Sequence, residues 1–183
     1  MTARRLVVLA GPIGAGKSAV AERLGHVFAA AGLTAVAVDL DDLAFAHRGP
    51  VDVPDFWRRA GIAHVALVRG WFEAGVDVVI AHGPFFESGT YDELFGAAGR
   101  DGRVHHVLLT VDAGVALERV TADPDRGPDA GSKDPVFLRS THDHFATIVP
   151  TLPPTDLVLD TTNMRRRDVA ARIAELVLRD DAP

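Results

Sequence analysis

The sequence predicts a three-layer α/β domain, in which a parallel sheet of five strands lies between two layers of helices. Short, continuously apolar runs alternate with helix-length amphipathic segments along the whole chain. Strands of this kind are typical of a parallel sheet that is covered by helices on both faces. The 183 residues are 48% apolar and contain no repeat or long linker, so we expect one domain over residues 1–183.

Five short apolar runs predict the strands. The first, RLVVLA, stops at Gly11, and the second, TAVAVD, stops at a cluster of aspartates. Their shortness and their content of β-branched residues favour strands over helices. The predicted strands cover residues 5–10, 34–39, 76–81, 104–111 and 156–160.

Apolar spacing and end residues predict the helices that connect these strands. In residues 17–31 the apolar side chains recur on one helical face, and a glycine closes the segment. Asp134 followed by Pro135 is a typical helix start, with Asp as the N-cap. Gly61 and Gly70 weaken the prediction of one long helix, because each costs about 1 kcal/mol inside it. The predicted helices cover residues 17–31, 55–74, 113–122 and 165–178, with another from Pro135 onward and a short one after the aspartate cluster.

Composition excludes several classes of function. The chain has no cysteine, so disulfides, thiolate zinc sites and cysteine nucleophiles are ruled out, and the histidines show no zinc-ligand spacing. A net charge of −6 argues against nucleic-acid or anionic-membrane partners, and no apolar run approaches the roughly 20 residues that cross a bilayer. We therefore expect a cytoplasmic protein. Only Lys17 and Lys133 among the 19 basic residues are lysines, which draws attention to both.

A glycine-rich loop joins the first strand to the first helix. The stretch GPIGAGKS fits the pattern G-x-x-x-x-G-K-[ST] in the strand–loop–helix setting that this pattern requires. Small residues let backbone N–H groups surround a phosphate, Lys17 can reach the β- and γ-phosphates, and the Ser18 hydroxyl can bind Mg²⁺. An ordinary glycine turn would need neither of these two side chains. We expect ATP and Mg²⁺ as cofactors, with the nucleotide bound by Gly11, Pro12, Ile13, Gly14, Ala15, Gly16, Lys17 and Ser18.

Three aspartates follow the second strand. Asp39, Asp41 and Asp42 would repel one another unless a cation lies nearby, and Mg²⁺ on the nucleotide is a natural candidate. We expect Asp41 to be the catalytic carboxylate on the acceptor side and Asp39 to support the Mg²⁺ site. The alternative for Asp41 or Asp42 is a helix cap, since Asp is a favoured N-cap.

The segment after the third strand is expected to face the same edge of the sheet. It reads AHGPFFE and has no carboxylate at the strand end, where His82 stands instead. His82, Phe85 and Glu87 are candidate contacts to an acceptor molecule, and Arg58 could reach that site from the long helix. Core packing is the competing interpretation for the phenylalanine.

Basic residues surround the polar loop over residues 123–134. This Gly- and Pro-rich stretch could form a lid that closes over phosphates, and a solvated surface loop is the alternative. Arg126 and Arg139 are the expected catalytic cations. Arg119 is expected to stack on the adenine through its planar guanidinium. Thr162, after the fifth strand, is expected to border the base unless it only caps the last helix.

With these residues in place, the chain resembles the small P-loop phosphotransferases, which include shikimate, gluconate and adenylylsulfate kinases and chloramphenicol phosphotransferase-like proteins. Asp39-x-Asp41 looks like their D-x-D, whose second Asp contacts the hydroxyl that is phosphorylated. Leu117-Glu-Arg119 with Arg126 looks like their lid entry, and Asp160-Thr-Thr162 like the segment before their final helix. The resemblance implies a strand order of 2-3-1-4-5. The chloramphenicol phosphotransferase-like group has acidic residues after its third strand, and this sequence departs from it there.

The leading functional hypothesis is a kinase that transfers the γ-phosphoryl group of ATP to a hydroxyl of a small metabolite or antibiotic. A nucleoside or nucleotide kinase is the first alternative. A non-catalytic nucleotide-binding regulator is the second; the motifs N/T-K-x-D and D-x-x-G, which a GTPase-type switch needs, are absent from the sequence.

Overall fold

A computed structural model of the chain describes residues 4–46, 48–49, 52–85, 88–127 and 130–179. Its centre is a five-stranded parallel sheet with strand order β2-β3-β1-β4-β5. The strands are β1 (Arg5–Ala10), β2 (Ala35–Asp39), β3 (Val78–His82), β4 (Arg103–Thr110) and β5 (Leu157–Asp160). The predicted fold class and strand order are therefore confirmed.

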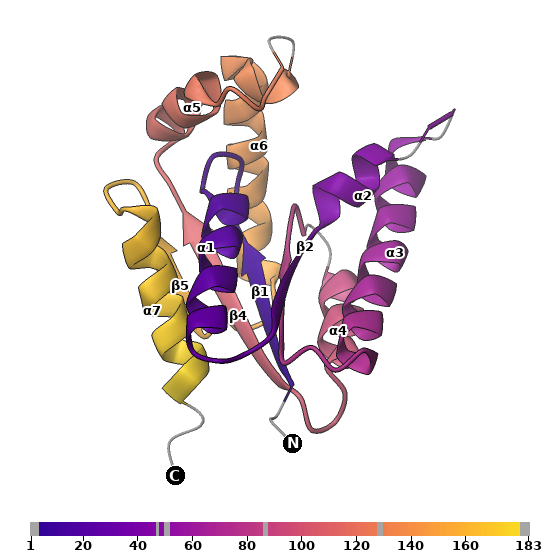
Figure 1. The fold of residues 1–183 in the computed structure, drawn as a ribbon. Coiled ribbons are helices and arrows are strands. Elements are labelled where there is room, and N and C mark those ends of the chain that lie inside the picture. Colours follow the sequence, from indigo (N-terminus) through magenta and orange to yellow (C-terminus); the bar gives the residue numbers. More distant parts are fainter. Residues whose placement is uncertain (1–3, 47, 50–51, 86–87, 128–129, 180–183) are drawn as a thin grey trace.

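Helices cover both faces of the sheet (Figure 1). The helices α1 (Lys17–Ala30) and α7 (Arg166–Arg179) pack side by side on one face. The helices α3 (Val53–Glu73) and α4 (Ser88–Ala97) pack on the other face, and α6 (Pro135–Ile148) contributes Phe145 to the same core. The two remaining helices, α2 (Leu40–Ala46) and α5 (Ala113–Ala122), directly follow β2 and β4 near the carboxyl ends of the strands.

The central strand β1 explains why the sheet needs both layers. All six of its residues are buried, and they alternate between the two cores: Leu6, Val8 and Ala10 on one side, Val7 and Leu9 on the other. Because successive side chains of a strand point to opposite faces, the apolar run from Leu6 to Ala10 must be covered on both sides. This arrangement directs the loop after β1 to the edge of the sheet where the carboxyl ends of the other strands also meet.

Several element boundaries differ from the sequence predictions. The long helix α3 runs without interruption through Gly61 and Gly70, because its apolar face packs on the sheet and on α4 and this tertiary packing outweighs the cost of the glycines. The strand β3 begins two residues later than predicted and extends to His82. The helix α4 was not predicted at all, since its short sequence SGTYDELFGA has a weak amphipathic pattern and two glycines.

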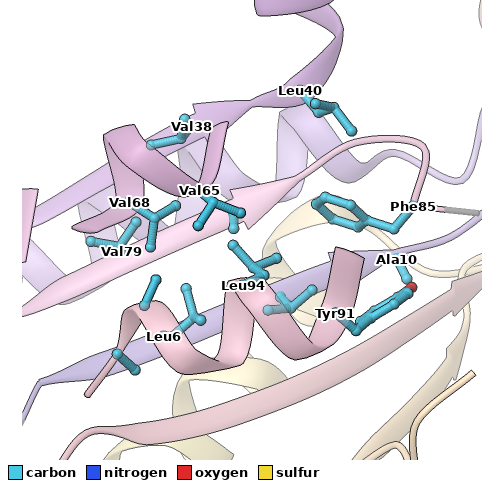
Figure 2. Close-up of a cluster of buried hydrophobic side chains, with 14 of the residues drawn as sticks. Leu6, Ala10, Val38, Leu40, Val65, Val68, Val79, Phe85, Tyr91 and Leu94 are labelled. Carbon is cyan, nitrogen blue, oxygen red and sulfur yellow. The ribbon is translucent and has the colours of Figure 1, made fainter. Parts of the chain in front are cut away.

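The core between the sheet and helices α3 and α4 contains a tyrosine with an unusual environment. Figure 2 shows Tyr91 of α4 among Leu94, Phe85 and Ala10, at the end of the cluster that lies near the close of β1. The ring is fully buried and lies 5.6 Å from the ring of Phe85 and 4.9 Å from that of His106. Within the described part of the chain, its hydroxyl has no hydrogen-bond partner. A buried polar atom without a partner destabilises the folded state.

We therefore expect Tyr91→Phe to raise the free energy of unfolding by roughly 1 kcal/mol, because it removes the hydroxyl and keeps the ring contacts. Tyr91→Ala is the control and should lower the same free energy by about 3–5 kcal/mol through cavity formation. Chemical denaturation of the three proteins measures both changes. A Tyr91→Phe protein less stable than the parent would show that the hydroxyl has a favourable partner.

Candidate active site

The glycine-rich loop lies between β1 and α1, as its sequence pattern predicts. Gly14 and Gly16 have φ angles of +78° and +92°, which favour glycine over any other residue. At Gly14 there is also no room, since a Cβ atom would lie 2.7 Å from Cβ of Ala116 in α5. The loop is thus pressed against α5 at a point where only glycine fits.

Side chains from other elements hold the outside of this loop. The guanidinium of Arg119 donates to the carbonyl oxygen of Gly14 at 3.2 Å, and Nε2 of His142 donates to that of Ile13 at 2.8 Å. In a trans peptide the C=O and the following N–H point in opposite directions. Because the Ile13 carbonyl is bound from α6, the N–H of Gly14 points to the inside of the loop, as phosphate binding requires.

Lys17 lies at the start of α1 with its ammonium group over the loop. Nζ donates to the carbonyl oxygens of Gly11 and Pro12, at 2.8 and 3.1 Å. Burial lowers the pKa of Lys17 to about 8, nearby Asp41 and Asp39 oppose that change, and Arg126 adds to it. The ammonium is therefore poorly solvated and lies within the field of two carboxylates and one guanidinium.

Asp39 connects the second strand to the glycine loop. Its Oδ1 accepts a hydrogen bond from the N–H of Asp41 at 2.9 Å, and its Oδ2 accepts one from the Ser18 hydroxyl at 3.3 Å. The first contact is that of a helix N-cap, because Asp39 directly precedes α2. The capping role that we considered for Asp41 or Asp42 is thus filled by Asp39, which also reaches Ser18.

Ser18 and Asp39 supply oxygen ligands of the kind that Mg²⁺ prefers. Mg²⁺ in nucleotide sites keeps several waters and takes only one or two ligands from the protein, with phosphates supplying the rest. The pair therefore fits a nucleotide-bound Mg²⁺, and we expect Ser18 as a ligand and Asp39 to hold its waters. Among the described residues there is no cluster of three or more His, Asp and Glu side chains that could hold a metal ion without a nucleotide.

Asp41 is half-buried on the first turn of α2, close enough to Lys17 and Arg126 for both to affect it. Burial raises the pKa of Asp41, the charge of Asp39 raises it further, and Lys17 and Arg126 lower it. Asp42, the next residue, is exposed. The structure thus brings Asp41, and not Asp42, into the group that surrounds Lys17.

His82 occupies a different place from the one its sequence position suggested. We expected a contact to the acceptor, but the side chain is only 4% exposed, and its Nδ1 lies 3.3 Å from Oδ2 of Asp39 on the neighbouring strand. Burial lowers the pKa of His82 to about 4, so the imidazole is neutral at physiological pH. The buried imidazole therefore lies next to Asp39 and not where an acceptor could contact it, so the expected direct contact to the acceptor is wrong.

Two of the other predicted acceptor contacts, Phe85 and Arg58, are engaged elsewhere in the structure. Phe85 is 2% exposed and packs against Tyr91 and His64, so the interpretation as core is the right one for this residue. Arg58 is exposed on α3, where its guanidinium is hydrogen bonded to Asp55. Glu87 lies outside the described residues.

The loop over residues 123–134 is held by its own hydrogen bonds where it is described. Lys133 donates to the carbonyl of Arg126 at 2.8 Å, and Arg126 donates to the Ser132 hydroxyl at 2.9 Å and to the Asp123 carboxylate at 3.2 Å. Lys133 therefore orders the loop, while the charge of Arg126 reaches both Lys17 and Asp41. Arg139 is exposed on α6, which follows the loop.

The segment after β5 is fastened to the glycine loop. Arg119 donates to the carbonyl oxygen of Thr161 at 2.6 Å. The hydroxyl of Thr161, which is buried, donates to the carbonyl oxygen of Ala15 at 3.1 Å. Thr162 donates to Asp160 at 2.6 Å and precedes α7 by four residues, so it does not cap that helix. The structural roles of Thr161 and His142 were missed, because neither side chain stands in a local pattern that marks it.

No family model matches the sequence, and no curated protein matches it either. Solved structures do match. Shikimate kinase from Acinetobacter baumannii in complex with shikimate is 18% identical, with a TM-score of 0.61, over 98% of this chain and 96% of that one. A sugar kinase from Janibacter sp. is 23% identical, also with a TM-score of 0.61 and the same coverage.

A third similar structure is the tunicamycin resistance protein of Deinococcus radiodurans. It is 16% identical, with a TM-score of 0.61, over 95% of both chains. These likenesses show that the chain has the fold of the small P-loop kinases over nearly its whole length. In the described part of the structure, no helix is both long enough and apolar enough to span a membrane.

The environment of Lys17 predicts that this residue destabilises the nucleotide-free protein. Its pKa is lower in the folded state, so the unfolded chain binds more protons between pH 8 and 10.5, and stability rises with pH across that window. Lys17→Met should raise the free energy of unfolding by roughly 1–3 kcal/mol at pH 7. That gain should disappear as the pH approaches 10.5, the ordinary lysine value.

Denaturation of Lys17→Met and the parent across this pH range tests the prediction, with Lys133→Met as a control for the loss of one positive charge. A constant difference at all pH values would contradict it. Lys17→Met should also lose nucleotide binding, which isothermal titration calorimetry with ATP measures.

Proposed function

We propose that the protein is a kinase that transfers the γ-phosphoryl group of ATP to a hydroxyl group of a small molecule. One observation carries this proposal: a half-buried carboxylate, Asp41, lies in the field of Lys17 at the edge of the sheet where the glycine loop opens. Nucleotide binding alone requires the loop and Lys17. It does not require Asp41, a carboxylate with a raised pKa that lies beside Lys17 in addition to Asp39.

The glycine loop and the start of α1 would hold the triphosphate. The inward N–H groups and the helix N-terminus favour negative charge, and Lys17 would exchange its two carbonyl contacts for phosphate oxygens. Bound Mg²⁺ would neutralise charge on the β- and γ-phosphates. Ser18 and Asp39, already hydrogen bonded to each other, would keep their positions for that ion.

Asp41 would orient the acceptor hydroxyl and receive its proton. A catalytic base works best when its pKa approaches the operating pH, and burial together with Asp39 raises the pKa of Asp41 in that direction. Asp39 would be unsuited to this task, because both of its oxygens already accept hydrogen bonds. The neutral His82 beneath Asp39 would add no positive charge that could lower the pKa of Asp41.

Arg126 would supply positive charge from the loop over residues 123–134. Phosphoryl transfer depends mainly on positioning and on electrostatic stabilisation of the transferred group, and a cation delivered by a loop can act only when that loop is closed. The influence of Arg126 on both Lys17 and Asp41 supports a role for it on the side of the transferred phosphoryl group. We assign Arg139 the same role as a second candidate, on the first turns of α6.

The fold comparisons support the proposal in its general form, since a shikimate kinase and a sugar kinase share the architecture. The position of Asp41 also bears on the non-catalytic alternative. A regulator would be favoured if Asp41 merely capped α2, but Asp39 forms that cap and leaves the Asp41 carboxylate beside Lys17.

The proposal predicts that Asp41→Asn keeps ATP binding and loses phosphoryl transfer. Turnover should fall by roughly 10²–10⁴-fold, the usual contribution of a general base, while the affinity for ATP changes little. Asp42→Asn is the matched control, because this neighbour is exposed and should keep full activity. The assay mixes ATP and Mg²⁺ with sugars, sugar acids, nucleosides, shikimate-like alcohols and hydroxylated antibiotics and identifies products by mass spectrometry.

Addition of one phosphate to a single class of alcohol, lost in Asp41→Asn and kept in Asp42→Asn, is the expected result. Equal rates for Asp41→Asn and the parent would remove Asp41 from the mechanism. Tight ATP binding without a phosphorylated product would exclude these classes of acceptor and would favour the non-catalytic nucleotide-binding regulator.

A further inference from the structure

Three consecutive carbonyl oxygens of the glycine loop are held by side chains from other elements. The oxygens of Ile13, Gly14 and Ala15 accept hydrogen bonds from His142 of α6, Arg119 of α5 and Thr161 after β5. The peptide bonds of the loop are trans, so each N–H points away from the carbonyl oxygen of the residue before it. The N–H groups of Gly14 and Gly16 are therefore directed away from these three elements, to the inside of the loop.

The side chain of Ile13 joins the loop to the two helices that border residues 123–134. It packs against a small hydrophobic cluster, apart from the two cores of the sheet, whose buried members are Ala116, Val120 and Leu138. The helices that form this cluster, α5 and α6, lie side by side (Figure 1). Since α5 ends just before the segment with Arg126 and α6 begins just after it, both ends of that segment are tied to helices that contact the loop.

His142 binds the loop directly from α6. Its Nε2 lies 2.8 Å from the carbonyl oxygen of Ile13, and because that oxygen can only accept, Nε2 carries the proton. The imidazole is half-buried, one helical turn after Leu138, so the hydrogen bond and the apolar contact from α6 act on the same loop residue. Arg119, in contrast, also binds the segment after β5, and its loss would disturb two places at once.

We propose that His142 is a positioning residue of the nucleotide site. By holding the carbonyl of Ile13, it presets the N–H of Gly14 for a phosphate oxygen and connects the loop to the helix where the segment with Arg126 ends. Binding of the triphosphate and placement of Arg126 beside it are thereby linked. This inference rests on the proposed function for the role of Arg126. His142 itself acts through Ile13 and not on the reacting groups.

Substitutions at position 142 separate the hydrogen bond from the rest of the side chain. In His142→Gln the amide nitrogen stands as many bonds from Cα as Nε2 does, so the donor is kept. His142→Met keeps the length and loses the donor, with a similar helix propensity, and in His142→Asn the donor is too short to reach. His144→Met is the control, because His144 is exposed two residues further along α6, on a different face.

Isothermal titration calorimetry measures the affinity of each protein for a non-hydrolysable ATP analogue and for inorganic tripolyphosphate, both with Mg²⁺. His142→Met and His142→Asn should bind both ligands roughly threefold to tenfold more weakly, the value of one hydrogen bond. His142→Gln and His144→Met should bind them as the parent does. Unchanged affinity in His142→Met, equally weak binding by His142→Gln, or a loss confined to the analogue, which alone carries a base, would each overturn the inference.

A double-mutant cycle tests the link to Arg126. Arg126→Gln should weaken binding of the ATP analogue in the parent and much less in His142→Met, because the loosened loop no longer aligns the phosphates with Arg126. In His144→Met, the effect of Arg126→Gln should equal that in the parent. Effects of Arg126→Gln and His142→Met that multiply to within about twofold, as those of independent sites do, or no effect of Arg126→Gln in the parent, would refute the link.

The assay of phosphoryl transfer separates this inference from the proposed function. The expected pattern of affinities without a phosphorylated product would count against the kinase and keep the role of His142. Phosphorylation by the parent, together with equal affinities in His142→Met and the parent, would keep the kinase and refute the role of His142. Binding of neither ligand by the parent would refute both.

Discussion

The contact between the glycine loop and α5 is the constraint on which the rest of the site depends. At Gly14 the backbone lies so close to Ala116 that no side chain fits, and Arg119 of the same helix binds the carbonyl of this glycine. The loop is therefore fixed from outside, and packing orients the N–H groups that face its inside. Because α5 leads directly into residues 123–134, the loop and the segment that carries Arg126 share one support.

The parallel sheet also concentrates charged side chains at one of its edges. Parallel strands bring all their carboxyl ends together, so Asp39 from β2 and His82 from β3 become neighbours of Lys17, which follows β1. Burial disfavours the charged form of each of these groups. It therefore lowers the pKa values of Lys17 and His82 and raises the pKa of Asp41. Such shifted groups cluster at functional sites more often than elsewhere.

The sequence predicted those parts of the molecule that depend on local pattern. The strand order followed from the resemblance, and the loop over Gly11–Ser18 followed from its own residues. The aspartate cluster was assigned correctly to the edge of the sheet, but the choice of the capping residue required the distances from Asp39 to Asp41 and Ser18. His82 and Phe85 were misjudged because position after a strand does not reveal burial, and His142 because its partner lies 129 residues away. Long-range contacts of this kind have no signature in a single sequence.

The end of β3 carries a histidine, and the carboxylate nearest to it comes from the neighbouring strand β2. Where a carboxylate at the end of β3 would be expected to assist a nucleotide-bound cation, this chain has a buried, neutral imidazole, and its Asp39 reaches Ser18 instead. Asp39 on β2 lies two residues before Asp41, whose pKa is raised first by burial and then by the charge of Asp39. In the proposed mechanism, support of the cation and activation of the acceptor would be coupled through Asp39. In this chain, the residue that caps α2 also adds to the effect of burial in raising the pKa of the proposed base.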